Sequence, residues 1–187
     1  MNAASLLHPT LWRTSRVLAN RTRLRMLALL LRQPDLTVSA VADGLGIAPP
    51  DASRNLRALE ARGFLAAKRD GRRVKYRWNS QAETPVQLLL AALHHRFDSA
   101  SEPVEEIFKT ATAFTHPRRM EILRVLNEGP RNFEQLQSTT RVSTPALRRH
   151  LRKLRTRTFV SFRSGRFRVE PRADLLGREL MRLATAG

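Results

Sequence analysis

The chain has 187 residues, enough for one ordinary domain or two small ones. It carries 34 basic and 16 acidic residues, a formal net charge of +18, and its hydrophobic fraction of 42% is sufficient for a folded core. It contains no cysteine, which excludes disulfides, thiolate metal sites, iron–sulfur clusters and cysteine nucleophiles.

The first half of the chain predicts five helices and a hairpin. A helix is expected over 4–18, and the next begins after Asn20, a suitable N-cap, with leucines at helical spacing. A short helix over 38–45 ends at Gly46. The next helix opens with two prolines and ends at Gly63; counted from the helix that begins after Asn20, it is the third helix of its copy. Two strands, residues 64–68 and 74–78, then flank Asp70-Gly71, a strong hairpin signal, and a helix follows over Pro85–Phe97.

The second half predicts the same elements in the same order. A helix over Pro103–Thr115 precedes one that begins at Pro117, and a short helix over 133–140 ends at Arg141. The following helix opens at Ser143-Thr144-Pro145, where Ser143 is the expected N-cap. Strands over 159–163 and 166–170 flank Ser164-Gly165, and a last helix is expected over Ala173–Ala184.

The two halves are copies of one module. With one residue skipped before Val38, many side chains match in order. The matched pairs are Leu27 and Leu123, Leu30 and Leu126, Pro50 and Pro145, Arg54 and Arg149, Leu56 and Leu151, Arg57 and Arg152, Leu59 and Leu154, Arg62 and Arg157, and Phe64 and Phe159. A run of matches with a single gap indicates an internal duplication.

The order helix, helix, turn, helix, hairpin is that of a winged helix-turn-helix. We therefore predict a mostly α chain with small β-hairpin wings, built as tandem winged helix-turn-helix modules over residues 1–98 and 103–187. The helices that flank each module are apolar on one face. They either complete the core of their own module or pack together as the bundle of an internal pseudo-dimer, which is the arrangement we expect.

Short motifs in the first copy follow one another over residues 17–78: Leu18-Ala19-Asn20, Thr22-Arg23-Leu24, Leu45-Gly46-Ile47, Ser53-Arg54-Asn55-Leu56 and Gly71-Arg72-Arg73-Val74-Lys75-Tyr76. They resemble those of the ArsR-type winged-helix transcriptional repressors. The second copy is a weaker match, through His116-Pro117-Arg118-Arg119 and Leu147–Leu154, and lacks glycine where the first copy has Gly46 and Gly63. The resemblance implies DNA binding, with the third helix in the major groove, and a repressor. A typical member has one module and acts as a homodimer, so two modules in one chain depart from the pattern.

The resemblance also raises the question of a metal effector, because many members sense metals. The candidates are His94, His95 and Asp98, of which His94 and Asp98 are four residues apart on a predicted helix. A single such pair is too small for a closed metal site. We therefore expect no metal and no cofactor, and ordinary surface or interface roles for these side chains.

Basic side chains concentrate where the fold would meet DNA. Residues 148–157 hold seven arginine, lysine or histidine residues and no acid, whereas a solvated helix face normally mixes signs. In the first copy Asp51 and Glu60 dilute the charge. The residues predicted to bind DNA lie on the third helix and the wing of each copy: Ser53, Arg54, Arg57, Lys68, Arg69, Arg72, Arg73 and Lys75 in the first, and Thr144, Arg148, Arg149, Arg152, Arg163 and Arg166 in the second.

No phosphate loop, nucleophile elbow or metalloprotease motif is present, so an enzyme is not expected. The predicted function is a sequence-specific transcriptional regulator that binds double-stranded DNA, as a monomer that acts as an internal pseudo-dimer, with further dimerisation left open. Two alternatives stay open: a nonspecific, nucleoid-type DNA or RNA binder, and a winged-helix scaffold for protein interactions. Without an apolar run of 18 residues or a secretory signal at the N-terminus, we expect no membrane partner and a cytoplasmic, nucleoid-associated location.

Overall fold

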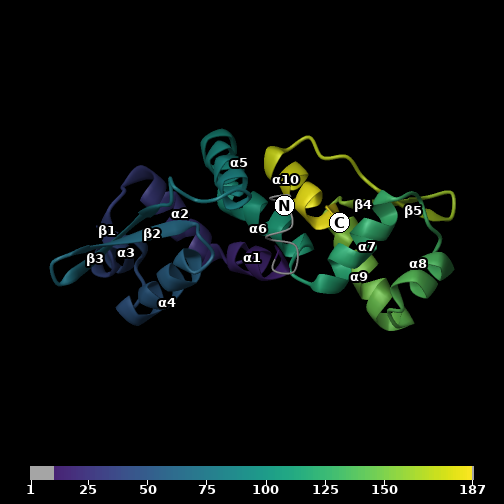
Figure 1. The fold of residues 1–187 in the computed structure, drawn as a ribbon, viewed down its shortest axis with the longest axis horizontal. Coiled ribbons are helices and arrows are strands. Elements are labelled where there is room, and N and C mark those ends of the chain that lie inside the picture. The colour runs from purple at the N-terminus through teal and green to yellow at the C-terminus, as the bar shows by residue number, and fades with distance from the viewer. Residues whose placement is uncertain (1–10, 187) are drawn as a thin grey trace. The chain divides into compact units, whose positions relative to one another are not determined.

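A computed structural model describes residues 11–186 and divides them into two compact units (Figure 1). The first unit comprises residues 17–108. The second comprises residues 109–186 together with residues 11–16. The interval between the two predicted modules, residues 98 to 103, contains the end of one helix at Ser99 and the start of the next at Pro103.

The first unit contains helices and a three-stranded antiparallel sheet of order β1-β3-β2. Its sheet packs against α2, α3 and α4. The elements of this half of the chain are α1 (Leu11–Leu18), α2 (Arg21–Arg32), β1 (Leu36–Thr37), α3 (Val38–Leu45), α4 (Pro49–Glu60), β2 (Leu65–Asp70), β3 (Arg73–Trp78), α5 (Val86–Ser99) and α6 (Pro103–Ala113). Of the helix predicted over 4–18, residues 4–10 lie outside the described residues.

The second unit repeats this order with a two-stranded sheet. Its elements are α7 (Pro117–Asn127), α8 (Phe133–Thr140), α9 (Thr144–Thr156), β4 (Val160–Arg163), β5 (Arg166–Val169) and α10 (Leu175–Thr185). The helices over 38–45 and 133–140 and the Ser164-Gly165 turn lie where the sequence predicts them. The described chain is thus mainly helical with small β-hairpins, and the two helix-turn-helix units with their hairpins confirm the predicted tandem winged helices.

Each unit encloses its own apolar core, built from matched positions. In the first unit α2, α4 and β2 direct Leu27, Leu59 and Phe64 inward, and each is fully buried. Their counterparts in the second unit, Leu123, Leu154 and Phe159, are also fully buried. The flanking helices contribute to these cores: Leu89 and Leu93 of α5 are buried in the first unit, and Leu176, Leu180 and Leu183 of α10 are buried in the second, where α10 packs on α7.

The duplication extends to a polar contact. In the first unit Arg23 Nε donates to the carbonyl oxygen of Val17 at 2.6 Å, and in the second Arg119 Nε donates to that of Ala113 at 2.5 Å. Asn20 and His116 are the matched N-caps of α2 and α7; Asn20 accepts a hydrogen bond from the backbone N–H of Arg23, and His116 accepts one from that of Arg118. An arginine in each unit thus ties the start of a core helix to the preceding segment.

Several local features differ from the sequence predictions. No local signal predicted β1, which pairs Leu36 with Tyr76, or the equivalent bridge between Arg131 and Phe167. Ser143 occupies the N-cap position of α9 without a side-chain cap hydrogen bond. The strands of the first hairpin extend to Asp70 and Arg73, which pair with each other, so Gly71 and Arg72 form the turn. The predicted ends of the flanking helices differ from the observed ones by one or two residues.

The turn before the third helix needs a left-handed residue in both units. Gly46 adopts φ 62° and ψ 41°, and Arg141 adopts φ 50° and ψ 28°. A Cβ atom added at Gly46 would meet no atom within 4 Å, so a substitution there would cost free energy only through the left-handed backbone conformation. Arg141 carries this cost in the wild type because its Cβ crowds the backbone in the left-handed region.

The substitution Arg141→Gly is therefore expected to stabilise the second unit by about 1 kcal/mol. The reciprocal change, Gly46→Ala, is expected to destabilise the first unit by a similar amount. Urea unfolding of both variants beside the wild type measures the two effects. A loss of stability in Arg141→Gly would show that the arginine side chain contributes more than its backbone conformation costs.

Candidate nucleic-acid interface

Helix α9 separates an apolar from a basic face. Leu147, Leu151 and Leu154 are buried in the second unit. The opposite face exposes four arginines, Arg148, Arg149, Arg152 and Arg155. None of the four forms an ion pair within residues 11–186. The helix thus presents a continuous, unneutralised cationic surface of guanidinium groups, which match phosphate oxygens and guanine edges.

Two side chains at the start of α9 contact α8. The Arg148 guanidinium lies over the ring of Phe133, 5.7 Å from its centroid. Thr144 Oγ1 accepts a hydrogen bond of 2.8 Å from Gln137 Nε2. The contact with Gln137 orients the Thr144 hydroxyl and leaves its own proton for donation to a ligand.

Positive charge along α9 also acts on Lys153. Burial lowers the pKa of the Lys153 ammonium, and the charges of Arg157 and Arg119 lower it further. Burial by itself lowers a lysine pKa, and the additional lowering by Arg157 and Arg119 reflects a positive local potential. The same potential attracts a polyanion.

Helix α4 presents a more diluted version of this surface. Ser53 is half-buried, and Arg54 and Arg57 are exposed. Arg54 forms an ion pair with Asp51 on the same helix face. Arg57 lies beside the hydroxyl of Tyr76, whose pKa is raised by burial and by the charge of Glu60. Asp51 is thus close enough to compete with DNA for Arg54.

The first hairpin exposes most of its predicted contact residues. Lys68, Arg69, Arg72 and Arg73 are exposed. Lys75 is half-buried, and its ammonium lies 2.7 Å from the carboxylate of Asp70. The hydrogen bond from Lys75 lowers the pKa of Asp70. Lys75 is therefore partly neutralised, whereas the arginines at the tip remain available to phosphates.

The second hairpin is shorter and carries fewer charges. Arg163 and Arg166 are cross-strand partners beside the turn, and both are exposed. Arg163 also lies 3.5 Å from the carboxylate of Glu170. All fourteen predicted contact residues are thus at least partly exposed, and the structure brings them together on one helix and one hairpin of each unit.

Sequence reasoning missed two exposed neighbours of this surface. Phe162 on β4 is 45% exposed, and the Arg155 guanidinium lies over its ring at 5.9 Å. Arg155 lies in the basic run of α9 but is not among the predicted contact residues, and for Phe162 the sequence predicts only its place in a strand. Only the register of β4 with β5 places Phe162 beside Phe167, with the ring centroids 4.6 Å apart.

A histidine pair lies beneath the basic face of α9. His150 is 3% exposed and packs on His116, with ring centroids 4.4 Å apart, and its Nδ1 has no hydrogen-bond partner in the described structure. Burial lowers the pKa of His150 to about 4, with further lowering by the charges of His116, Arg119, Arg149 and Arg118. His150 is thus a neutral packing group, at the position that Asn55 occupies in the first unit.

This low pKa makes stability depend on pH. In the unfolded chain a histidine titrates near 6.5, so at pH below 6.5 the unfolded state binds a proton that folded His150 does not. The part of the free energy of unfolding that depends on His150 is complete above pH 6.5. It falls as the pH drops toward 4, by about 2 kcal/mol between pH 7 and pH 5. Between pH 7 and pH 5 the melting temperature is expected to fall more in the wild type than in His150→Asn, which has the side chain found at this position in the first unit. Parallel pH profiles would contradict this prediction.

The candidate metal ligands form only a loose pair. His94 Nε2 lies 3.8 Å from Asp98 Oδ2, and the His94 ring packs near Trp78 with the centroids 5.6 Å apart. Among residues 11–186, no group of three histidine, aspartate or glutamate side chains is arranged to hold a metal ion.

Comparisons with known protein families identify both units. The model of bacterial regulatory proteins of the arsR family matches residues 116–161, and a helix-turn-helix domain model matches residues 18–66. The arsR-family match thus falls on the second copy, so the prediction that the second copy is the weaker match to this family was wrong. Comparison with curated proteins and with solved structures finds no match. No helix in residues 11–186 is long and apolar enough to cross a membrane. The two matches lie on the units whose basic helices and hairpins are described above, and together they support an ArsR-type helix-turn-helix regulator with two modules in tandem.

Proposed function

We propose that the chain is a sequence-specific repressor that binds double-stranded DNA with α4 and α9 in successive major grooves. The observation that carries the proposal is the exposed face of α9, where Arg148, Arg149 and Arg152 have no acidic partner among the described residues. Arginine can donate two hydrogen bonds to the O6 and N7 atoms of guanine, which makes these side chains suited to reading bases.

The remaining predicted residues are assigned by position. Ser53, Arg54, Arg57 and Thr144 lie on the third helix of their unit, where they contact base edges or the adjacent phosphates. The wing residues hold phosphates beside the groove. These are Lys68, Arg69, Arg72, Arg73 and Lys75 in the first unit and Arg163 and Arg166 in the second.

Two unlike recognition helices in one chain favour an asymmetric target. A symmetric homodimer reads the same half-site twice, whereas α4 has Pro49, Asp51 and Ser53 where α9 has Thr144, Ala146 and Arg148. We propose that one chain acts as an internal pseudo-dimer and that its half-sites are spaced by about one helical turn of DNA. Repression follows from the family resemblance, and the proposed location is the cytoplasmic nucleoid. The proposed role of the chain is to bind DNA, and it requires no catalytic activity.

The net charge of +18 favours a second candidate, a nonspecific coat on chromosomal DNA or RNA. Phosphate contacts alone attract every nucleic acid and weaken steeply with salt. A protein scaffold is less favoured, because a scaffold does not require an unneutralised arginine face.

Selection of genomic DNA fragments by the purified full chain at about 150 mM salt tests the proposal. We expect enrichment of one motif with two unlike halves about 10 base pairs apart. An even distribution of captured fragments would contradict sequence-specific regulation and leave the nonspecific candidate. Capture of RNA in preference to duplex DNA, in a matched competition, would likewise contradict it.

A further inference from the structure

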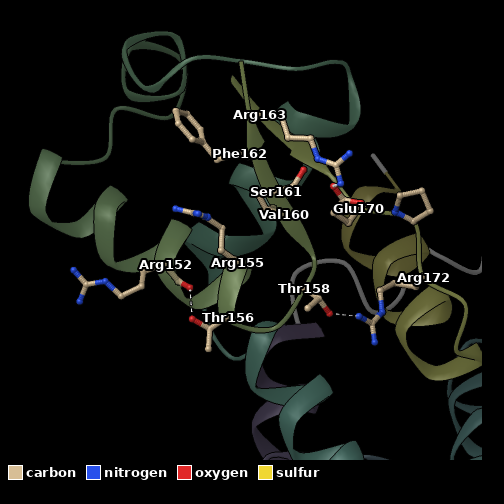
Figure 2. A pocket seen from close by; sticks show the side chains of 11 residues that line it. Arg152, Arg155, Thr156, Thr158, Val160, Ser161, Phe162, Arg163, Glu170 and Arg172 are labelled. Carbon is tan, nitrogen blue, oxygen red and sulfur yellow. Dashed lines mark hydrogen bonds and ion pairs between the residues drawn. The ribbon is translucent and has the colours of Figure 1, made fainter. Parts of the chain in front are cut away.

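The second unit has a hollow of about 710 Å³ beside the recognition helix (Figure 2). It lies between the C-terminal half of α9, strand β4 and the segment that joins β5 to α10. Its volume is in the range of small-molecule sites. Four arginines and one glutamate provide the charged groups of its lining: Arg152, Arg155, Arg163, Arg172 and Glu170.

Acids neutralise only two of these four arginines. The Arg172 guanidinium lies 2.6 Å from the carboxylate of Asp174, and Arg163 lies 3.5 Å from Glu170. Arg152 and Arg155 form no ion pair in the part of the chain that the structure describes. Two uncompensated guanidinium groups therefore border the hollow, which favours a ligand with about two negative charges.

Other lining groups are fixed or lack a partner. Arg172 is held in place, since it packs over the ring of Phe159 at 4.8 Å and also donates to Thr158 Oγ1, a contact that Figure 2 shows. The hydroxyl oxygen of Ser161 is buried and makes no hydrogen bond within residues 11–186. Successive side chains of a strand point to opposite faces, so Ser161 and Phe162 lie on opposite sides of β4.

An aromatic ring forms one side of the hollow. Phe162 is 45% exposed, and Figure 2 shows its side chain and that of Arg155 on the same side of β4. A planar ring can stack on an exposed phenyl group or a guanidinium, with a gain of about 1–3 kcal/mol. The lining thus pairs an anion-binding part with a stacking part.

The first unit lacks this chemistry at the matched positions. Glu60 stands where the second unit has Arg155, and Ala67 stands where it has Phe162. Both units nevertheless form the same helix and hairpin. The fold therefore does not require Arg155 and Phe162, and their presence in one copy alone indicates a role in binding.

We propose that this hollow binds a small molecule that joins a planar ring to two phosphate groups, of the nucleoside diphosphate class. The phosphates bind Arg152 and Arg155, and the ring stacks on Phe162. Because Arg152 and Arg163 also belong to the DNA surface, a bound ligand competes with DNA. This last consequence rests on the proposed function, whereas ligand binding itself does not.

Isothermal titration of the full chain without DNA, at about 150 mM salt, tests the site with ADP, pyrophosphate and adenosine as probes. ADP is expected to bind at least tenfold more tightly than either fragment, because only ADP uses both parts of the hollow. Arg155→Ala and Phe162→Ala are each expected to weaken ADP binding at least tenfold. The control Arg57→Ala/Lys68→Ala, which removes the counterparts of Arg152 and Arg163 in the first unit, is expected to leave it unchanged.

Three results would overturn the proposal. They are the absence of saturable ADP binding, equal affinities for ADP and pyrophosphate, and an equal loss in the control variant, which would indicate general attraction of anions to a basic chain. The titration contains no DNA, so its outcome is independent of the proposed function. If ADP binds and no DNA motif is enriched in the selection, the site stands and the regulator proposal fails; the reverse pattern overturns the site alone.

Discussion

The triple substitution of Arg148, Arg149 and Arg152 by alanine is expected to lower affinity for the selected DNA site by about a thousandfold. Each base or phosphate contact by such an arginine contributes roughly 1–3 kcal/mol, and the triple substitution removes all three contacts at once. The loss should appear in equilibrium binding measured by fluorescence anisotropy at a fixed, near-physiological salt concentration.

A charge-matched control separates base contacts from general electrostatics. Arg25, Arg32 and Arg178 are exposed on α2 and α10, so their triple substitution by alanine removes the same charge. This control is expected to lower affinity less than tenfold, through the long-range field alone. Equal losses in the two triple variants would contradict the assignment of α9 as a recognition helix.

The arginines of α4 are expected to contribute less. Arg54 must leave its ion pair with Asp51 before it can contact DNA, which offsets part of the gain. Arg54→Ala/Arg57→Ala should therefore weaken binding by a smaller factor than the loss of two arginines from α9.

The substitution Phe159→Ala is expected to destabilise the second unit by about 3–5 kcal/mol. Phe159 is fully buried, packs edge-on against Phe114 with ring centroids 4.8 Å apart, and lies beneath the Arg172 guanidinium. Truncation leaves a cavity that the surrounding side chains fill only in part. A loss of this size is a large share of the stability of a small domain.

Hydrogen exchange measured by mass spectrometry localises this effect. Phe159→Ala should raise exchange in α7 and α9, and the matched change Phe64→Ala should raise it in α2 and α4, because each ring lies in the core of its own unit. The exposed neighbour Phe162 serves as the control, and its replacement by alanine is expected to cost less than about 1 kcal/mol. Similar losses for Phe159→Ala and Phe162→Ala would show that burial in this core does not determine stability.

Local sequence signals predicted most of the fold because they act over a few residues. The helices over 38–45 and 133–140 end at the predicted turns, where Gly46 and Arg141 both adopt the left-handed conformation. Strand β1 escaped prediction because two residues carry no periodicity and its partner, β3, is distant in sequence.

Ser143 shows how one residue can cancel the signal of another. A serine at the N-cap normally accepts a hydrogen bond from the second or third helical N–H. Pro145 occupies the second helical position and has no N–H. The same proline that marks the start of α9 thus removes one of the two donors that the Ser143 side chain would use.

The residue types of the candidate interface followed from the sequence, whereas their partners did not. The run of arginines after Leu147 predicted the basic face of α9, because helical spacing alone places it opposite the leucines. The contact between Gln137 and Thr144 depends on the packing of α8 against α9. The hollow beside α9 also depends on three separate segments, so no single stretch of sequence indicates it.

The most direct test of the central claim, that α4 and α9 each read one half of a single site, is hydroxyl-radical footprinting of the selected DNA. We expect the wild-type chain to protect two half-sites about 10 base pairs apart. The α9 triple variant should lose protection of one half and Arg54→Ala/Arg57→Ala protection of the other, each at a protein concentration that keeps the complex bound. Loss of the same half-site in both variants, or uniform protection without half-sites, would contradict the account.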